Sequence, residues 1–141
     1  MADFQGDDAL FGPEHVRTYR ETNGEHGYNW RGTEVLLLTT TGRKSGEEHT
    51  TPLIHRRDGD RFVIIASKGG APTHPAWYHN LRAHPEVTLE VGREKFRARA
   101  SVATDAERRR LYDKHAERMP AFWDYEKKTT RRIPVVVLDR I

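Results

Sequence analysis

One stretch, residues 34–52 (EVLLLTTTGRKSGEEHTTP), constrains the fold more than any other part of the chain. It begins with Val35–Thr40, a continuous run of branched and apolar residues that is short enough for one buried strand. The run leads into a loop bracketed by Gly42 and Gly46, which free the backbone to turn. The stretch therefore predicts a buried strand that ends in a sharply turning loop.

Between the two glycines stand three polar residues, Arg43, Lys44 and Ser45. Arginine and lysine supply positive charge and hydrogen-bond donors, and serine supplies a hydroxyl group. This combination suits a phosphate or a carboxylate better than an apolar ligand. Taken alone, the loop is more typical of a hairpin turn with solvated charges, so the choice depends on what a second loop adds.

Further segments carry the pattern of strands, namely residues 49–56, 61–67, 87–91, 94–102 and 135–138. Asp58-Gly59 is a strong hairpin signal between the first two of them, and Gly92-Arg93 separates the next two. In residues 94–102, apolar side chains alternate with Lys and Arg, which predicts a half-buried strand with a basic outer face. Neighbouring hairpins of this kind favour an antiparallel sheet.

Helical patterns occupy residues 13–24, 76–84, 105–119 and 121–128, whereas residues 1–12 look weakly ordered. About six strands and four helices, without repeats, favour an α+β fold. We predict a small closed or half-open barrel, a split β-barrel, with the helices packed on its ends. We divide the chain into an N-terminal extension at 1–29, with a short helix, and a barrel domain at 30–141.

Composition narrows the class of protein. The chain has 141 residues, which fits one domain, and its formal charge of +3 with a pI of about 9.3 mildly favours anionic ligands without demanding nucleic acid. It has no cysteine, which excludes disulfides and thiolate metal sites. The acidic start lacks the pattern of a signal peptide, and no apolar run is long enough for a membrane span. We expect a cytoplasmic protein; a peripheral membrane contact and a homodimer stay open.

A second loop strengthens the case for an anion site. Ser67-Lys68-Gly69-Gly70 follows directly after the predicted strand at residues 61–67. If that strand and the one at Val35–Thr40 both pair with the strand between them, the two loops open on the same rim. The helix that starts near Ala76 adds free N–H groups and a positive dipole end. Together the loops predict a cradle for an elongated anion, although neither is a Walker or Rossmann motif.

Aromatic residues, histidines, a serine and carboxylates form the other candidate sites in the sequence. Five aromatic residues are candidates for a flat-ring pocket or for ordinary core packing: Trp77, Tyr78, Phe122, Trp123 and Tyr125. His74, His79 and His84 are spaced so that they scatter around a helix, which argues against a metal site. Ser67 lacks the context of a nucleophile elbow, and we find no paired-carboxylate site.

Three segments resemble one known family. Residues 36–46 (LLLTTTGRKSG), 63–87 (VIIASKGGAPTHPAWYHNLRAHPEV) and 133–138 (IPVVVL) are similar to the deazaflavin-dependent nitroreductase family of the split β-barrel class. The resemblance covers residues 30–141. It implies a split barrel that binds the deazaflavin coenzyme F420, whose tail carries a phosphodiester and a glutamate chain. It also implies hydride transfer from the reduced deazaflavin to an electron-poor small molecule.

The resemblance also implies site residues. Arg43, Lys44 and Ser45 would contact the anionic tail, and Thr50, Thr51 and Pro52 would lie along the cofactor. The phosphate region and ring edge would be held by Ala66, Ser67, Lys68 and Gly69, with Ala76, Trp77 and Asn80 completing the cofactor site. The electron acceptor, which is the small molecule that is reduced, would contact Met119, Phe122 and Tyr125. No metal is implied.

One departure bears on the acceptor. Family members known for nitroimidazole reduction carry several tyrosines in the segment that matches residues 119–125, whereas this chain keeps only Tyr125 there. Nitro reduction needs a proton source as well as a hydride, and Tyr125 and Ser67 are the remaining catalytic hydroxyl candidates. The acceptor is therefore expected to be a quinone or another conjugated carbonyl, with a nitro compound as a further candidate.

Three other functions compete with this one. A split-barrel enzyme that uses FMN would also want a basic phosphate site. A non-catalytic carrier would hold deazaflavin or an acidic lipid in the same groove. A nucleic-acid binder would use the basic strand face of Arg93, Lys95, Arg97 and Arg99, but acidic residues interrupt that surface, so we rank this function last.

Overall fold

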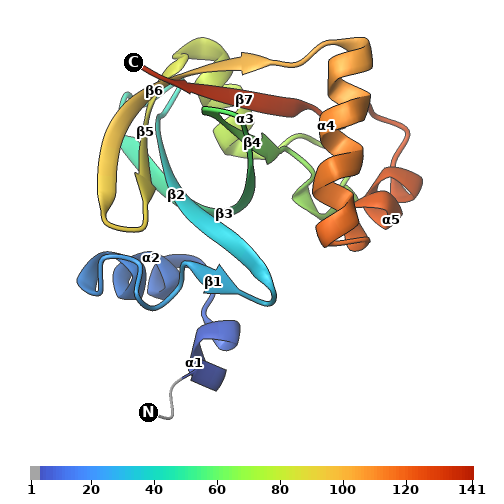
Figure 1. Ribbon diagram of the computed structural model, residues 1–141. Coiled ribbons are helices and arrows are strands. Elements are labelled where there is room, and N and C mark those ends of the chain that lie inside the picture. The colour runs from blue at the N-terminus through green and yellow to red at the C-terminus, as the bar shows by residue number, and fades with distance from the viewer. Residues whose placement is uncertain (1–3) are drawn as a thin grey trace.

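The apolar runs become strands, and six of them close into an antiparallel barrel (Figure 1). The computed structural model describes residues 4–141. In sheet order, the barrel strands are β2 (Thr33–Thr41), β3 (Glu48–Asp58), β4 (Arg61–Ile65), β7 (Val135–Arg140), β6 (Glu94–Val102) and β5 (Glu86–Val91). β5 pairs with β2 and closes the ring, while β1 (Asn29–Trp30) is an extra strand beside β2. The predicted barrel of about six antiparallel strands is confirmed.

The helices pack around this barrel. In Figure 1, α4 (Asp105–Arg118) and α5 (Ala121–Lys128) lie to one side, beyond β7, and α1 (Phe4–Ala9) and α2 (Gly12–Glu21) lie below the barrel near β1. The short helical turn η1 (Lys68–Gly70) and the helix α3 (Ala76–Ala83) follow β4. The four predicted helices are confirmed. A membrane crossing by a helix would need a longer apolar segment than any found in residues 4–141.

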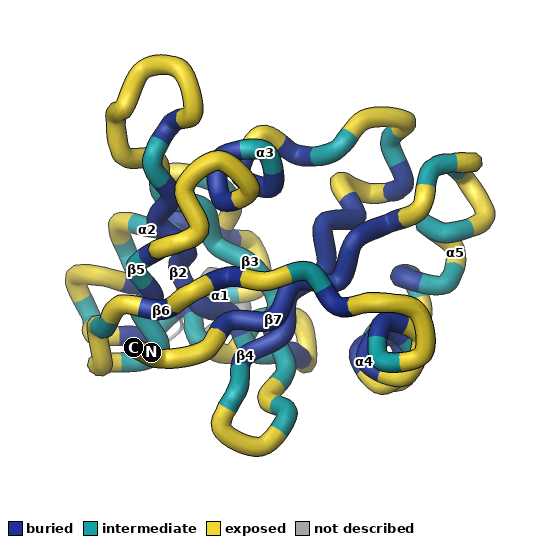
Figure 2. The backbone as a smooth tube through the Cα atoms, turned by 90° about the horizontal axis from the view of Figure 1, so that it is seen from above, coloured by how far each residue is buried: buried dark blue, intermediate teal, exposed yellow. Residues whose placement is uncertain are grey.

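Three strands are buried on both faces, which explains why they read as continuous apolar runs instead of alternating patterns. The barrel interior holds one set of their side chains: Leu36, Leu38, Phe62, Ile64, Val136 and Leu138. The opposite faces of β4 and β7 are covered by α4 and α5, and the opposite face of β2 is covered by α2. Figure 2 shows the buried runs of β4 and β7 in dark blue. Each buried apolar side chain contributes about 1.5–3 kcal/mol relative to an exposed one.

The prediction of a weakly ordered segment at residues 1–12 is wrong for the part that the structure describes. Residues 4–9 form α1, and Leu10 is buried. The indole Nε1 of Trp30 donates a hydrogen bond of 3.0 Å to the Leu10 carbonyl, which ties this segment to β1. The pattern misled because few apolar residues stand here, yet Leu10 is buried while its neighbour Phe11 stays exposed. Residues 1–3 of this prediction lie outside the described residues.

Tyr19 fastens α2 to the barrel. Its side chain is 1% exposed, its hydroxyl donates to the Val35 carbonyl at 3.0 Å, and the Gly92 N–H donates to that hydroxyl at 2.7 Å. Burial raises the pKa of Tyr19 to about 12, so the phenol stays a neutral partner for both groups. The helix at the N-terminal end of the chain is thus held against β2 and the β5–β6 turn. The division at residues 29 and 30 stays a prediction.

Two histidines are buried beneath the helices. His55 of β3 and His115 of α4 are 2% and 1% exposed, and neither ring nitrogen of either residue makes a hydrogen bond to a described residue. The His115 ring packs edge-on against Phe122, with ring centroids 4.6 Å apart. Desolvation lowers the pKa of His55 to about 4 and that of His115 to about 3. Both rings are therefore neutral in the folded protein near neutral pH.

Acid is expected to destabilise the protein through these two histidines. The unfolded chain takes up their protons near pH 6.5, whereas the folded chain resists until about pH 4, so stability falls as pH drops below 6.5. Each histidine contributes a slope of about 1.4 kcal/mol per pH unit, so the two together account for about 2–3 kcal/mol between pH 6 and pH 5. Urea unfolding at pH 7, 6 and 5 measures this slope.

A matched pair of variants separates these rings from the other titrating groups. His115→Leu should remove about half of the slope, because leucine fills the site without titrating. The same substitution at His84, which is exposed at the end of α3, is the control for replacing a histidine on the surface. An unchanged slope in His115→Leu would show that the ring does not resist protonation.

Candidate active site

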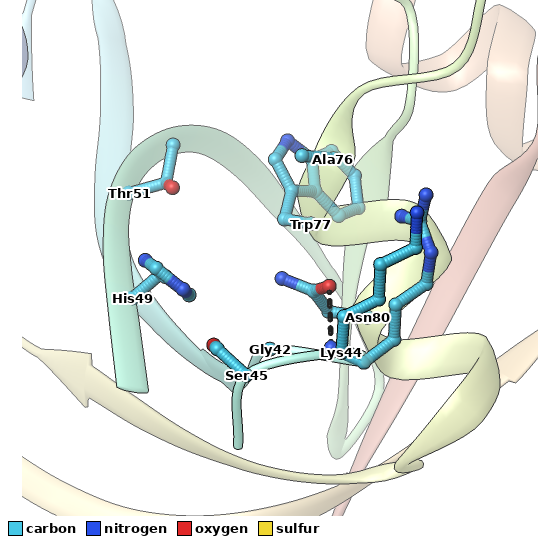
Figure 3. Close-up of a pocket in the computed structure, with 9 residues that line it drawn as sticks. Gly42, Lys44, Ser45, His49, Thr51, Ala76, Trp77 and Asn80 are labelled. Atoms are coloured by element: carbon cyan, nitrogen blue, oxygen red, sulfur yellow. Dashed lines mark hydrogen bonds between the residues drawn. The ribbon is translucent and has the colours of Figure 1, made fainter. Parts of the chain in front are cut away.

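Two adjoining hollows open at one rim of the barrel, and the first is polar. It has a volume of about 380 Å³ and is lined by Gly42, Arg43, Lys44, Ser45, His49, Thr51, Ala76, Trp77 and Asn80. Figure 3 shows Trp77 and Asn80 of α3 facing Thr51 and His49 of β3 across this hollow, with Gly42 and Ser45 along its lower edge. Residues from the β2–β3 loop, β3 and α3 thus meet in one place.

The β2–β3 loop turns tightly because its glycines allow it. The Gly42 N–H donates to the Glu47 carbonyl at 2.7 Å, and a Cβ atom at Gly42 would lie only 2.6 Å from Ser45 Oγ. Gly46 has a φ of +75°, in the left-handed region that side chains disfavour. The closed turn leaves Arg43 and Lys44 exposed at the rim of the polar hollow.

Asn80 anchors this loop to α3. Its side chain is 7% exposed; Nδ2 donates to Thr40 Oγ1 at 3.2 Å, and Oδ1 accepts from the Arg43 N–H at 3.1 Å. α3 begins at Ala76, so the positive end of its dipole lies at the same hollow. The loop, the amide and the helix end together hold positive charge in a defined place.

Within residues 4–141, Arg43 and Lys44 lack a carboxylate partner, and so do Arg93 and Lys95 on the basic strand face. Arg97 and Arg99 on the same face both pair with Glu86, at 3.6 and 3.1 Å. A charge without a protein partner keeps its full attraction for an anion from solution. Two such cations that line one hollow beside the start of α3 meet the requirement of the predicted anion site.

The second hollow is larger and mostly apolar. Its volume is about 510 Å³, and its lining comes from α2, β1, β3, the β4–α3 segment and α5. The lining residues most relevant to chemistry are His15, Trp30, Pro52, Ser67, Lys68, Gly69, Met119, Phe122 and Tyr125. Thr51 and Trp77 line both hollows, so the two spaces meet at these residues. An elongated ligand with an anionic end and a flat apolar end would fit across that junction.

Arg131 holds the loop that carries Ser67 and Lys68. Its guanidinium donates to the carbonyls of Ser67 at 2.7 Å, Ala71 at 2.8 Å and Ala66 at 3.2 Å. The loop needs this support because Lys68 has a φ of +48°, which is uncommon for a residue with a side chain. The Lys68 ammonium donates to Thr73 Oγ1 at 3.2 Å, and Lys68 is among the residues that line the apolar hollow and not the polar one.

The wall opposite β3 is aromatic. Phe122 and Tyr125 of α5 lie edge-to-face, with ring centroids 5.2 Å apart, and both line the apolar hollow. The Tyr112 hydroxyl donates to the Phe122 carbonyl and so fixes α5 against α4. Of the aromatic set from the sequence, Trp77 also lines the hollows. The Tyr78 hydroxyl instead accepts a hydrogen bond from Arg82, and the Trp123 indole donates one to Asp113.

The structure brings together nearly all of the residues singled out from the sequence. Thr50 and Ala66 lie outside both hollows. The Thr50 hydroxyl hydrogen-bonds Thr39 Oγ1 at 2.7 Å, and Ala66 is fully buried behind its loop. Of the three histidines at and around α3, which are His74, His79 and His84, His74 is bound by a protein side chain: its Nδ1 accepts a hydrogen bond of 2.9 Å from Arg131. Within residues 4–141, no group of three metal-ligating side chains is arranged around a common point.

Sequence reasoning missed four residues that shape the site: His15, Trp30, His49 and Arg131. His15 belongs to residues 1–29, which we predicted to be an extension, whereas Trp30 is the first residue of the predicted barrel domain. Arg131 lies far along the chain from the loop it holds. The sequence signal that pointed to them was a histidine, His15, and a tryptophan, Trp30, in a mostly polar segment. A helix that only packs on the surface does not require these two residue types.

A closed antiparallel barrel whose rim joins a cationic hollow to an aromatic one defines a class, the split-barrel proteins that hold a flat cofactor with an anionic tail. Comparison with known proteins identifies the family. The model of the F420H2-dependent quinone reductase family matches residues 12–140, and the chain belongs to that family. The family resemblance in the sequence is thereby confirmed.

Relatives and solved structures agree. The F420H2-dependent quinone reductase Rv1261c of Mycobacterium tuberculosis is 43% identical over 133 residues, which cover 89% of this chain and 87% of that protein. A solved F420H2-dependent reductase, FDR-A, is 34% identical with a TM-score of 0.70, and the match covers 77% of this chain and 95% of the other. A structure described as a domain-swapped dimer is 33% identical with a TM-score of 0.72, covering 88% and 96%.

Proposed function

We propose that this protein is an F420H2-dependent reductase that uses coenzyme F420 to reduce a quinone or a related conjugated carbonyl. The observation that carries this proposal is the junction of the two hollows at Thr51 and Trp77. One hollow offers unpaired cations, and the other offers aromatic and apolar walls. The family of the chain and the names of its relatives support the same cofactor and acceptor.

The residues present fit the cofactor. Arg43 and Lys44 would hold its anionic tail, with the α3 dipole adding to the attraction. Pro52 and Trp77 would pack against its ring, and Lys68 would reach the phosphate region or the ring edge. When bound in reduced form, the deazaflavin supplies a hydride, which is chemistry that no side chain of this protein provides.

The chain itself orients the acceptor and excludes water. Met119, Phe122 and Tyr125 would form the wall against which the acceptor lies, with Trp30 closing the far side. The Ser67 and Tyr125 hydroxyls would hydrogen-bond the acceptor oxygen as charge builds up there. Apolar surroundings strengthen such hydrogen bonds, because less water competes for them.

The first test is direct. Fluorescence titration with F420 should show saturable binding, and anaerobic mixing of the F420H2 complex with menadione should regenerate oxidised deazaflavin. Binding of FMN in place of F420 would favour the flavin alternative, and binding of F420 without turnover would favour a carrier. Nitroimidazoles in the same assay decide whether nitro compounds are substrates.

Light scattering should test for a homodimer, since one related structure is described as a domain-swapped dimer.

Tyr125→Phe should lower menadione turnover by about tenfold and leave F420 affinity nearly unchanged, because one hydrogen bond to the acceptor is worth about 1.5 kcal/mol. Steady-state kinetics and the fluorescence titration measure the two effects. Tyr78→Phe is the matched control, because it removes a hydroxyl that accepts from Arg82 outside both hollows. Weaker cofactor binding with normal turnover in Tyr125→Phe would move Tyr125 from the acceptor to the cofactor.

A further inference from the structure

His15 is a feature of the apolar hollow that the proposed function leaves unused. It stands near the start of α2, lines the hollow and is 3% exposed. Its ring lies beside the indole of Trp30, with centroids 5.7 Å apart and planes tilted by 43°. A histidine buried in this position, facing a space for a ligand, calls for a chemical explanation.

One hydrogen bond shows which nitrogen of this ring is occupied by the protein. Nε2 of His15 lies 2.9 Å from the Gly27 carbonyl oxygen, and because a carbonyl only accepts, Nε2 carries a proton. A Cβ atom at Gly27 would lie 3.1 Å from Cδ2 and 3.2 Å from Nε2, so this edge of the ring packs on the backbone. Nδ1 is on the other edge and has no hydrogen-bond partner among the described residues. Nδ1 is therefore the nitrogen left for a ligand in the hollow.

Resting on the proposed function, we propose that His15 is a catalytic residue whose Nδ1 hydrogen-bonds the quinone oxygen and gives it a proton. Reduction of a quinone to a quinol requires a hydride, which carries two electrons and one proton, and a second proton. The hydride adds to the quinone, and the negative charge appears on oxygen. The Nδ1–H bond of the imidazolium then breaks as the O–H bond of the quinol forms. Neutral His15 regains its proton from water after the product leaves.

Histidine suits this step better than the nearby hydroxyls. Alcohol and phenol groups hold their protons near neutral pH, whereas imidazole exchanges its proton readily there and is the commonest general acid in enzymes. The bond from Nε2 to the Gly27 carbonyl is present in both protonation states, so proton transfer does not turn the ring. Ser67 and Tyr125 would then orient the oxygen that His15 protonates.

Two quinones test the proposal. His15→Gln keeps an amide N–H for the Gly27 carbonyl but cannot give up a proton. With menadione, turnover of the F420H2 complex should fall by about a hundredfold, which is typical for loss of a general acid. With tetrachlorobenzoquinone, whose quinol is acidic and leaves as an anion, the loss should be well below about tenfold. The affinity for F420 should change little.

Controls distinguish proton donation from simple packing. Arg17→Ala alters the same helix at an exposed side chain that pairs with Glu14, and it should leave both turnover rates unchanged. Equal losses for the two quinones in His15→Gln would mean that the residue only supports the wall of the hollow, and they would overturn the proposal.

A spectroscopic measurement is independent of turnover. In protein labelled with ¹⁵N-histidine and bound to oxidised F420, added menadione should shift the His15 Nδ1 resonance and leave that of buried His55 in place. An unshifted Nδ1 would overturn the proposal. If the wild type reduces neither quinone, the proposed function fails, and the titration still decides whether His15 contacts a quinone.

Discussion

Replacing Arg43 and Lys44 together with alanine is expected to weaken F420 binding by about a hundredfold. A hydrogen bond to a charged group contributes about 1.5–3 kcal/mol, and the lower value applies at this open rim, which gives roughly tenfold for each cation. Neither residue packs in the core, so the melting temperature should stay the same. Fluorescence titration of the wild type and the double variant measures the loss.

Two controls locate the effect. A deazaflavin that lacks the anionic tail should bind both proteins alike, because its ring would meet only the apolar hollow. The double variant Arg97→Ala/Arg99→Ala removes as much positive charge from the strand face, where both arginines pair with Glu86, and should leave F420 affinity unchanged. Equal losses in the two double variants would mean that overall charge, and not the polar hollow, attracts the cofactor.

Replacing Arg131 with alanine is expected to destabilise the protein by about 3 kcal/mol and to abolish tight cofactor binding. The change leaves the Ala66 and Ser67 carbonyls without their donor, and an unsatisfied buried polar group costs about 1–3 kcal/mol. For a chain of this size, that loss should lower the melting temperature by about 10 °C. Calorimetry measures the stability, and the F420 titration measures the binding.

Arg131→Lys is the informative comparison. Lysine keeps the positive charge, but its single ammonium cannot reach all the acceptors that the planar guanidinium fork reaches at once. It should therefore behave nearly like alanine in both measurements. Recovery of stability and of F420 binding in Arg131→Lys would show that charge alone, and not the shape of the guanidinium, holds the Ser67–Lys68 loop.

Local sequence patterns were sufficient to predict most strands of the barrel. The continuous apolar runs at β2, β4 and β7 predicted buried strands, because both faces of those strands are covered. The β2–β3 loop could also be read in advance, since Gly42 and Gly46 allow the tight turn that exposes Arg43 and Lys44. The strand boundaries differ from the expected ones by only a few residues.

The N-terminal segment shows what local sequence patterns do not reveal. Val16 and Tyr19 share one face of their helix, so the pattern indicated only that the helix could lie on the body of the protein. Its docking depends instead on single long-range contacts, such as the hydroxyl of Tyr19 on Val35 and Gly92 and the Trp30 indole on Leu10. Such contacts leave no periodic trace in the sequence, because one residue makes each of them.

By itself, the sequence determined the strands, the turning glycine loops, the cations between the loop glycines and the family resemblance, since each of these is encoded within a short stretch of chain. Only the tertiary structure decided which segments meet: the β2–β5 pairing that closes the barrel, α2 over the apolar hollow and Arg131 under the Ser67–Lys68 loop. The physical reason is that burial and hydrogen bonding act between residues that are neighbours in space, and folding brings Arg131 to Ser67 and His15 to Gly27.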